Sequence, residues 1–187
     1  MNIDTLRRMA DRAEIQDCLC RYARGVDRGD WDLVRSTYHD DAEDQHGEYS
    51  GGIDGLIDWL DQRFAGVDNS MHFLGNSLIE FAAPDFAFVE TYFSSRRLRA
   101  PLAAERKELQ PNDQICREAW GRYADHFERR NGEWRVIKRL VVLESSYTSI
   151  AFGGERSRTT AGTWGCRNRE DPTYFERRAL FARATHM

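Results

Sequence analysis

Apolar side chains in the first third of the chain recur at offsets of three and four residues, the period of a helix that packs one face against a core. The first predicted helix has this spacing at Ile15, Leu19, Tyr22 and Val26. A second is predicted after Asp30 as its cap, with Trp31, Val34 and Tyr38 inward. A third presents Ile53, Leu56, Ile57, Leu60 and Phe64. Residues from about Asp4 to Phe64 are therefore predicted to be mainly helical, with one short edge strand from Asp44 to Tyr49.

From about His72 the pattern changes to segments rich in aromatic and β-branched residues, which is typical of strands. The four predicted strands are Met71 to Phe81, Phe86 to Ser94, Cys116 to Arg129 and Glu133 to Ser146. Asn131-Gly132 joins the last two and indicates a tight hairpin, because both residues tolerate positive φ. Helices followed by antiparallel strands predict an α+β fold with the helices on one face of a curved sheet.

Two segments do not fit this sheet. The charged stretch from Arg96 to Asp113 is long for a hairpin connection, so we expect either a flap at a cavity mouth or a solvated surface loop. After Ile150 the chain runs through glycine-rich and charged segments to a short helical end. We expect one domain over residues 1–148 and a C-terminal extension over residues 149–187 that covers the cavity or contacts a second subunit.

Composition narrows the class of protein. The chain has 187 residues and a net charge of −4, which suits one globular domain that encloses a core and a cavity. Basic and acidic residues are mixed without a long basic run, so we expect no nucleic-acid partner. The apolar runs are too short to span a bilayer and the first residues lack a signal-peptide pattern, so we expect a cytoplasmic protein. The four cysteines show no zinc-binding spacing and are expected to be reduced thiols.

One acidic residue lies beside the apolar stripe of the first helix. Asp27 follows Ala23 by four residues and Cys20 by seven, so it is predicted to project toward the interior. The alternative is a solvated carboxylate at the helix end. His72 lies in an apolar segment and offers a partner, since a histidine with a pKa of about 6.5 accepts protons near neutral pH. We predict a proton-transfer dyad in which His72 is the general base and Asp27 orients it.

Other polar and aromatic residues allow more than one interpretation. Asp44 and His46 alternate along a short predicted strand, so pocket lining and solvent exposure both stay open for them. Tyr22, Tyr38 and Trp120 are expected in the core or in a pocket wall. No pair of potential ligands has helical spacing and no glycine-rich phosphate loop follows a strand, so we expect neither a metal nor a nucleotide cofactor. His39, His126 and His186 are expected on a loop, at a strand edge and in the chain terminus, respectively.

Four segments in the same order resemble a known family. They are Val26 to Asp32, Tyr38 to Gly47, Met71 to Asn76 and Gly121 to Trp134. Together they resemble the SnoaL-like branch of the NTF2-like (cystatin-like α+β) superfamily, in the subgroup similar to scytalone dehydratase, bile-acid 7α-dehydratase and hexachlorocyclohexane dehydrochlorinase. The resemblance covers residues from about 8 to 148.

The resemblance implies a cone-shaped antiparallel sheet around a helix, with a deep apolar pocket between them. In the dehydratase and dehydrochlorinase relatives an acid matching Asp27 pairs with a histidine matching His72, which is the base. His46 falls where scytalone dehydratase has a pocket tyrosine, which implies a hydrogen bond to a substrate oxygen. A further pocket histidine of that dehydratase has no counterpart, and an ungapped match lands near Arg97.

These observations predict a cofactor-independent lyase that acts on a small aromatic or polycyclic alcohol. Its substrate-binding residues are expected to be His46, Tyr22, Arg97, Tyr38 and Trp120. The alternatives are a formaldehyde-releasing lyase of aryl diols in aromatic catabolism, and an isomerase or aldol cyclase that uses the same base. A non-catalytic ligand-binding protein, or one like the small subunits of ring dioxygenases, would instead predict no contact between Asp27 and His72. Apolar strand faces and the assembly of relatives predict a homodimer or homotrimer.

Overall fold

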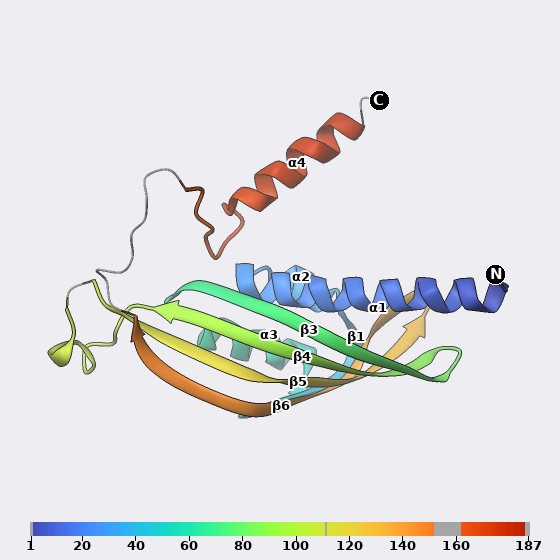
Figure 1. Cartoon of the computed structure of the whole chain (residues 1–187), viewed down its shortest axis with the longest axis horizontal. Helices are drawn as coiled ribbons and strands as arrows, with labels where there is room; N and C mark the ends of the chain where they lie inside the picture. The colour runs from blue at the N-terminus through green and yellow to red at the C-terminus, as the bar shows by residue number, and fades with distance from the viewer. Residues whose placement is uncertain (1, 111, 152–161, 186–187) are drawn as a thin grey trace.

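A curved, unclosed sheet of six strands lies against the N-terminal helices, which confirms the predicted α+β class (Figure 1). The computed structural model describes residues 2–110, 112–151 and 162–185. Helix α1 runs along the concave side of the sheet, and the long strands bend beneath it (Figure 1). None of the helices in these ranges combines the length and the apolar character that a membrane span needs.

The helices begin and end at residues whose chemistry explains the boundaries. Helix α1 spans Ile3–Arg28 and ends at Gly29, which takes the left-handed conformation with φ of 62°. Helix α2 spans Trp31–Arg35, and the carboxylate of its N-cap, Asp30, accepts a hydrogen bond from the backbone N–H of Leu33. Helix α3 spans Ile53–Arg63. The prediction that Tyr38 belongs to the second helix is wrong, because that helix is only one turn long and Tyr38 begins a strand.

The sheet order is β2-β1-β6-β5-β4-β3. The strands are β1 Tyr38–His46, β2 Tyr49–Gly52, β3 Val67–Ala83, β4 Phe86–Arg99, β5 Gln114–Arg130 and β6 Glu133–Ala151. Strand β1 pairs parallel with β6, whereas every other pair is antiparallel. The expectation of a purely antiparallel sheet is wrong, because the β1–β6 pair is parallel. The segment predicted as an edge strand, Asp44 to Tyr49, is also placed differently, because β2 pairs with the outer side of β1 and forms the edge instead.

The long strands extend beyond their predicted ends. The hairpin between β5 and β6 is confirmed, with positive φ at both Asn131 and Gly132. Strand β4 continues to Arg99, so four residues assigned to the charged loop, Arg96 to Arg99, belong to the sheet. Strand β6 continues to Ala151, past the expected domain boundary at residue 148.

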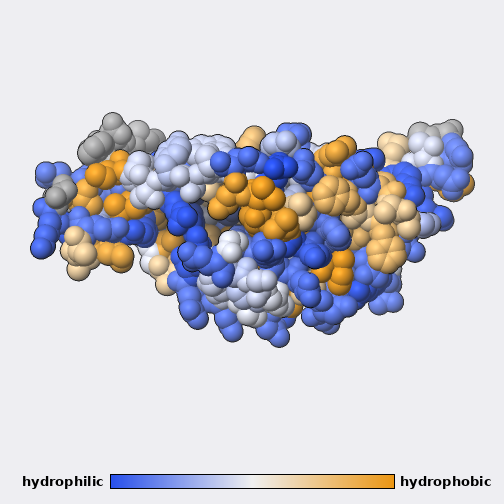
Figure 2. Space-filling model, turned by 90° about the horizontal axis from the view of Figure 1, so that it is seen from below, coloured by the Kyte–Doolittle hydropathy of each residue, from blue (hydrophilic) through white to orange (hydrophobic). Residues whose placement is uncertain are grey.

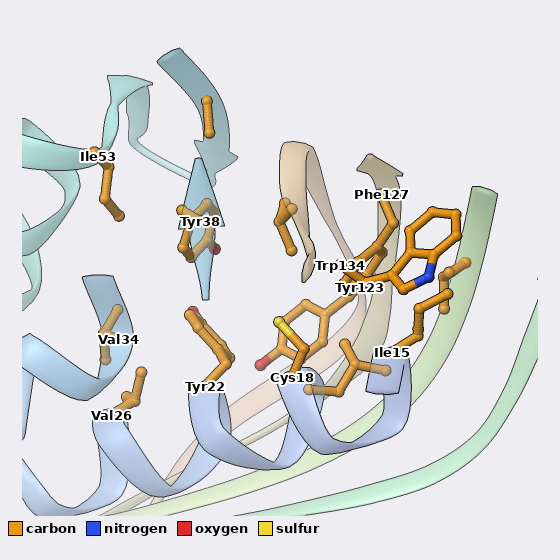
Figure 3. Packing of buried hydrophobic residues seen from close by; sticks show 14 of the residues in the cluster. Ile15, Cys18, Tyr22, Val26, Val34, Tyr38, Ile53, Tyr123, Phe127 and Trp134 are labelled. Carbon is orange, nitrogen blue, oxygen red and sulfur yellow. The ribbon is translucent and has the colours of Figure 1, made fainter. Parts of the chain in front are cut away.

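The core lies between α1 and the concave face of the sheet. Figure 3 shows Ile15, Cys18 and Tyr22 pointing from α1 toward the strands. The ring of Tyr22 makes edge contacts with Tyr38 and Tyr123, at centroid distances of 6.0 and 5.7 Å. Edge-to-face aromatic contacts add stability beyond the area that they bury. The predicted apolar face of α1 is therefore the face that builds the core.

A buried ion pair lies beneath these three tyrosines. Arg139 on β6 donates two hydrogen bonds to the carboxylate of Asp125 on β5, at 2.7 and 2.6 Å, and both side chains are fully buried. Arg139 also donates to the hydroxyl of Tyr38, which in turn donates to Asp44 at 2.7 Å. Arg139 and Asp125 compensate each other's charge, so the network ties β1, β5 and β6 together at one point.

The charged loop and the C-terminal extension lie at the margins of the domain. The loop after β4 holds the short 3-10 helix η1, Arg106–Glu108, and projects from one end of the sheet (Figure 1). Helix α4, Pro172–Ala184, stands apart from the sheet and has no buried residue (Figure 1). The start of the extension is nonetheless attached, since Tyr174 donates to Asp30 and Asp171 pairs with Arg28. Predictions for residues 152–161 and for His186 lie outside the described residues.

Replacing Asp125 with alanine leaves the charge of Arg139 buried without its partner. We expect Asp125→Ala to lower the free energy of unfolding by about 3–5 kcal/mol, measured by urea denaturation. The matched control is Glu144→Ala, which removes a half-exposed carboxylate facing Arg122 on the neighbouring strand. The control is expected to cost at most about 1 kcal/mol. Equal losses in the two variants would contradict the role given to the buried pair.

Candidate active site

The last turn of α1 places Asp27 against strand β3. Its Oδ1 lies 2.7 Å from Nδ1 of His72 and accepts a hydrogen bond of 2.7 Å from the hydroxyl of Ser70. Its Oδ2 accepts the backbone N–H of His72 at 2.7 Å. Asp27 is 7% exposed, so the alternative of a solvated carboxylate at the helix end is wrong. The acid and the histidine predicted to pair are in direct contact.

Two opposing effects act on the carboxyl group of Asp27. Burial raises its pKa, but the hydrogen bonds and the charge of His72, together with the hydroxyl of Ser70, outweigh burial and lower the pKa below its ordinary value. The position is costly in a second way, because a carboxylate in the last helical turn faces the negative end of the helix dipole. The donors of β3 therefore favour the ionised form of Asp27 and offset the cost of its burial.

The ionised state of Asp27 fixes the tautomer of neutral His72. A carboxylate accepts hydrogen bonds and carries no proton of its own, so Nδ1 of His72 must donate across the 2.7 Å contact. Nε2 then carries the lone pair and is free to accept a proton. His72 lines a cavity, and its ring packs near that of Phe93, with centroids 6.4 Å apart. The arrangement has the parts of a general base held by an acid.

A cavity of about 80 Å³ opens beside His72, between α1, α3 and the concave face of the sheet. Its apolar walls include Val26, Leu60, Phe64, Phe93 and Val141. None of the described residues of the loop after β4 lines it, so a flap at the cavity mouth finds no support in this structure. Apolar side chains thus surround the dyad on one side, while Arg63, Arg97 and Arg117 line another part of the same cavity.

Three of the five predicted substrate-binding residues line this cavity: Tyr22, His46 and Arg97. Burial raises the pKa of Tyr22, so its hydroxyl stays protonated as a hydrogen-bond donor. The ring of His46 packs on Trp59 with centroids 5.4 Å apart, and its Nδ1 lies 3.4 Å from Asp44. Of the two alternatives left open for His46, the structure thus shows that its side chain lines the pocket and is not fully exposed to solvent.

The other two predicted binding residues do not line the cavity. Tyr38 is buried in the core, and its hydroxyl is used by Asp44 and Arg139. Trp120 packs on Tyr147 at a centroid distance of 5.0 Å, while its neighbour Ala119 faces the cavity. Successive strand residues point to opposite faces, which explains why Trp120 is excluded.

Three residues of the site were not among the predicted ones: Ser70, Arg63 and Arg117. Ser70 lies two residues before His72 on the same strand, so strand alternation already placed both on one face. Arg117 shares a face with Ala119 for the same reason. Nothing in the sequence was a reason to place Arg63 in the site. It is the last residue of α3, and an arginine there is often explained by its favourable interaction with the helix dipole.

No cluster of three or more potential ligands that could hold a metal ion occurs in residues 2–110, 112–151 and 162–185. His46 and His72 both line the cavity, but each contacts its own carboxylate. His46 lies next to Asp44, and His72 lies next to Asp27. The side chains of the two pairs can transfer protons and form hydrogen bonds.

Comparison with solved structures finds the same fold in several proteins of low sequence identity. The chain is similar to a hexachlorocyclohexane dehydrochlorinase (LinA) Type2, with 24% identity and a TM-score of 0.61 over 80% of this chain and 94% of the other. A LinA-type3 dehydrochlorinase from Novosphingobium barchaimii gives 24% identity and a TM-score of 0.60 over 80% and 95%. A candidate scytalone dehydratase from Novosphingobium aromaticivorans gives 15% identity and a TM-score of 0.63 over 76% and 90%.

Identities at this level establish the shared fold and nothing finer. Among proteins with curated descriptions, no match to the sequence was found. A family model described as a SnoaL-like domain matches residues 7–140, a span that contains α1, the dyad and most of the sheet. The chain therefore belongs to the SnoaL-like domain family, with its NTF2-like fold.

Proposed function

We propose that the protein is a cofactor-independent lyase in which His72 is the general base and Asp27 orients it. The observation that carries this proposal is the 2.7 Å contact between Nδ1 of His72 and Oδ1 of Asp27 at the wall of a partly apolar cavity. An ionised acid buried at the unfavourable end of a helix and paired with a cavity histidine is an arrangement that is found preferentially at active sites. The names of the similar structures, a dehydrochlorinase and a candidate dehydratase, both describe eliminations.

The proposed reaction begins with proton transfer from a substrate carbon next to an activating group to Nε2 of His72. The electron pair of that C–H bond forms a double bond to the adjacent carbon, and the leaving group departs from that carbon with its bonding pair. Asp27 stabilises the imidazolium through the Nδ1 contact. The imidazolium then returns its proton to the leaving group or to solvent, which restores the base.

The walls of the cavity suit a small aromatic or polycyclic alcohol. Phe93 and Tyr123 stack with ring centroids 4.4 Å apart and offer an aromatic surface close to His72. Tyr22, His46 and Arg97 line the same cavity and are placed to donate hydrogen bonds to an oxygen of the substrate or of the leaving group. Loss of water is the main proposal, and release of formaldehyde from an aryl diol uses the same base.

The test is mass-spectrometric profiling of pooled aromatic and alicyclic alcohols, both neutral and carboxylate-bearing, incubated with the protein. We expect at least one compound to be consumed with the loss of one water or one formaldehyde. A product of unchanged mass but altered retention would instead identify an isomerase or a cyclase. Absence of turnover across the pools would contradict an enzymatic function for this site.

The dyad makes a specific prediction for the compound that this profiling identifies. His72→Ala and Asp27→Asn are each expected to lower kcat by about 100-fold to 10,000-fold, the range for loss of general-base catalysis. The matched control is His126→Ala, because the ring of His126 packs on Phe88 with centroids 6.0 Å apart and does not line the cavity. Full activity of Asp27→Asn would rule out the proposed role of the acid.

Ser70 makes a prediction about stability and pH. The lowered pKa of Asp27 means that its carboxylate stabilises the fold above the ordinary value of 3.8 and that this stability is lost as pH falls through the folded-state pKa. Ser70→Ala removes one lowering hydrogen bond, so we expect a loss of about 1 kcal/mol at neutral pH that shrinks as pH falls below 3.8. Urea denaturation across this pH range measures it.

The control for Ser70→Ala is Ser77→Ala. The hydroxyl of Ser77 bonds to Thr91 and to no carboxylate, so its loss is expected to cost the same at every pH. A pH-independent cost for Ser70→Ala as well would show that Ser70 does not act through the ionisation of Asp27.

Self-association through the outer face of the sheet is proposed as well. Large apolar side chains on that face are exposed, among them Met71 at 58% and Phe73 at 70%, and apolar patches lie among polar ones on the surface seen in Figure 2. Burying such side chains in a symmetric dimer or trimer removes them from water. Light scattering at micromolar concentration is expected to give a mass above 21.8 kDa, and a monomer would contradict the proposal.

A further inference from the structure

Arginines gather at the outer end of the cavity that holds the dyad. Arg63, Arg97 and Arg117 all line this cavity, and the same three line an adjoining cavity of about 210 Å³. They therefore stand where the two chambers meet. Arg167, from the C-terminal extension, adds a fourth positive charge beside them, because its guanidinium and that of Arg97 both lie over the ring of Phe64, at 4.6 and 4.8 Å.

The sheet register forces two of these arginines together. Arg97 on β4 is directly opposite Arg117 on β5, so their side chains leave the same face of the sheet as immediate neighbours. Like charges directly opposite each other on two strands destabilise a sheet. An anion between them would turn this repulsion into two attractions.

Carboxylates that would neutralise the group are scarce within the described ranges. The nearest ion pair joins Arg63 to Glu48 at 3.6 Å, and the side chain of Glu48 is 86% exposed. Neither Arg97 nor Arg117 has an ion pair with any described carboxylate. Arg99, two residues along β4, shows the contrast, since it makes a bidentate pair with Glu105 at 2.7 and 2.8 Å.

The pKa of Arg97 agrees with a guanidinium held without a counter-charge. Burial, and then the positive charges of Arg63, Arg117 and Arg167, lower it to about 10. Arg97 still carries its charge at neutral pH. The protein thus maintains a partly buried, repelled cation at a cavity, and such an arrangement gains stability when an anionic ligand arrives.

We propose that Arg97 and Arg117, assisted by Arg63, bind a carboxylate of the substrate, so that the substrate is an aromatic or alicyclic alcohol that also carries a carboxylate. This inference rests on the proposed function in that it assigns the anionic end of the same substrate. Guanidinium groups bind carboxylates through paired hydrogen bonds and so orient them as well as hold them.

The register also places the arginine pair and the dyad in neighbouring rows of the sheet. Ser70 is opposite Arg97 and His72 is opposite Ser95, so the dyad and the arginine pair occupy adjacent cavity-facing rows of the sheet. Two residues along a strand span about 7 Å. A substrate whose carboxylate lies roughly one aromatic ring away from the acidic C–H bond fits this spacing.

Equilibrium binding of benzoate tests the site without requiring turnover. Isothermal titration at low ionic strength is expected to show benzoate binding at least about tenfold more tightly than benzamide, its neutral analogue of the same shape. Arg97→Gln and Arg117→Gln are each expected to weaken benzoate binding by about tenfold and to leave benzamide binding unchanged. Arg117 is exposed, so its replacement is not expected to disturb folding.

The matched control is Arg7→Gln, which removes the same charge from an exposed position on α1 and is expected to leave benzoate binding unchanged. Equal affinities for benzoate and benzamide, or equal losses in Arg7→Gln and Arg97→Gln, would overturn the proposal. His72→Ala is expected to keep benzoate binding. Failure of the elimination assay would therefore count against the dyad, whereas failure of these titrations would count against the anion site.

Discussion

The carboxylate of Asp27 joins the end of helix α1 to strand β3, and the site depends on this junction. Its two oxygens accept hydrogen bonds from the backbone of His72 and the hydroxyl of Ser70 and contact the imidazole of His72. Burial and the helix dipole both oppose a charge at this position. The charge persists because β3 supplies three polar groups at one spot, so the helix end, the strand and the ionisation state determine one another.

The rest of the fold keeps that junction in place. The face of α1 that carries Tyr22 and Val26 packs on the sheet, and the buried pair of Arg139 and Asp125 fixes the strands beneath Tyr22. Tyr22 contacts both the buried pair and the cavity, since Arg139 lies over its ring and Tyr22 also lines the cavity. A buried ion pair is a costly way to gain stability, but it specifies register strongly because any shift of β5 against β6 leaves a charge without its partner.

Helical spacing and strand composition were sufficient to predict the α+β class and the apolar face of α1. The pairing of Asp27 with His72 was predicted from the chemistry of an acid and a histidine in apolar surroundings and from the resemblance to the SnoaL-like family. Tyr38 was assigned to a helix because its spacing from Val34 fits a helical face, and only the tertiary fold shows that the chain becomes a strand there. Trp120 was assigned to the pocket because aromatic content does not reveal which strand face points inward. The opposition of Arg97 and Arg117 depends on the register between β4 and β5, which is a long-range property that local patterns do not encode.

The central claim is that ionised Asp27 holds His72 with its proton on Nδ1 and its lone pair on Nε2. Nitrogen-15 NMR of the imidazole side chains, recorded on the wild-type protein with His72 in its neutral form, observes this tautomer directly. The account predicts a protonated Nδ1 and an unprotonated Nε2 for His72, with the proton signal of Nδ1 shifted by its hydrogen bond to Asp27. A neutral His72 with its proton on Nε2 would contradict the account, because the dyad would then have no base facing the cavity.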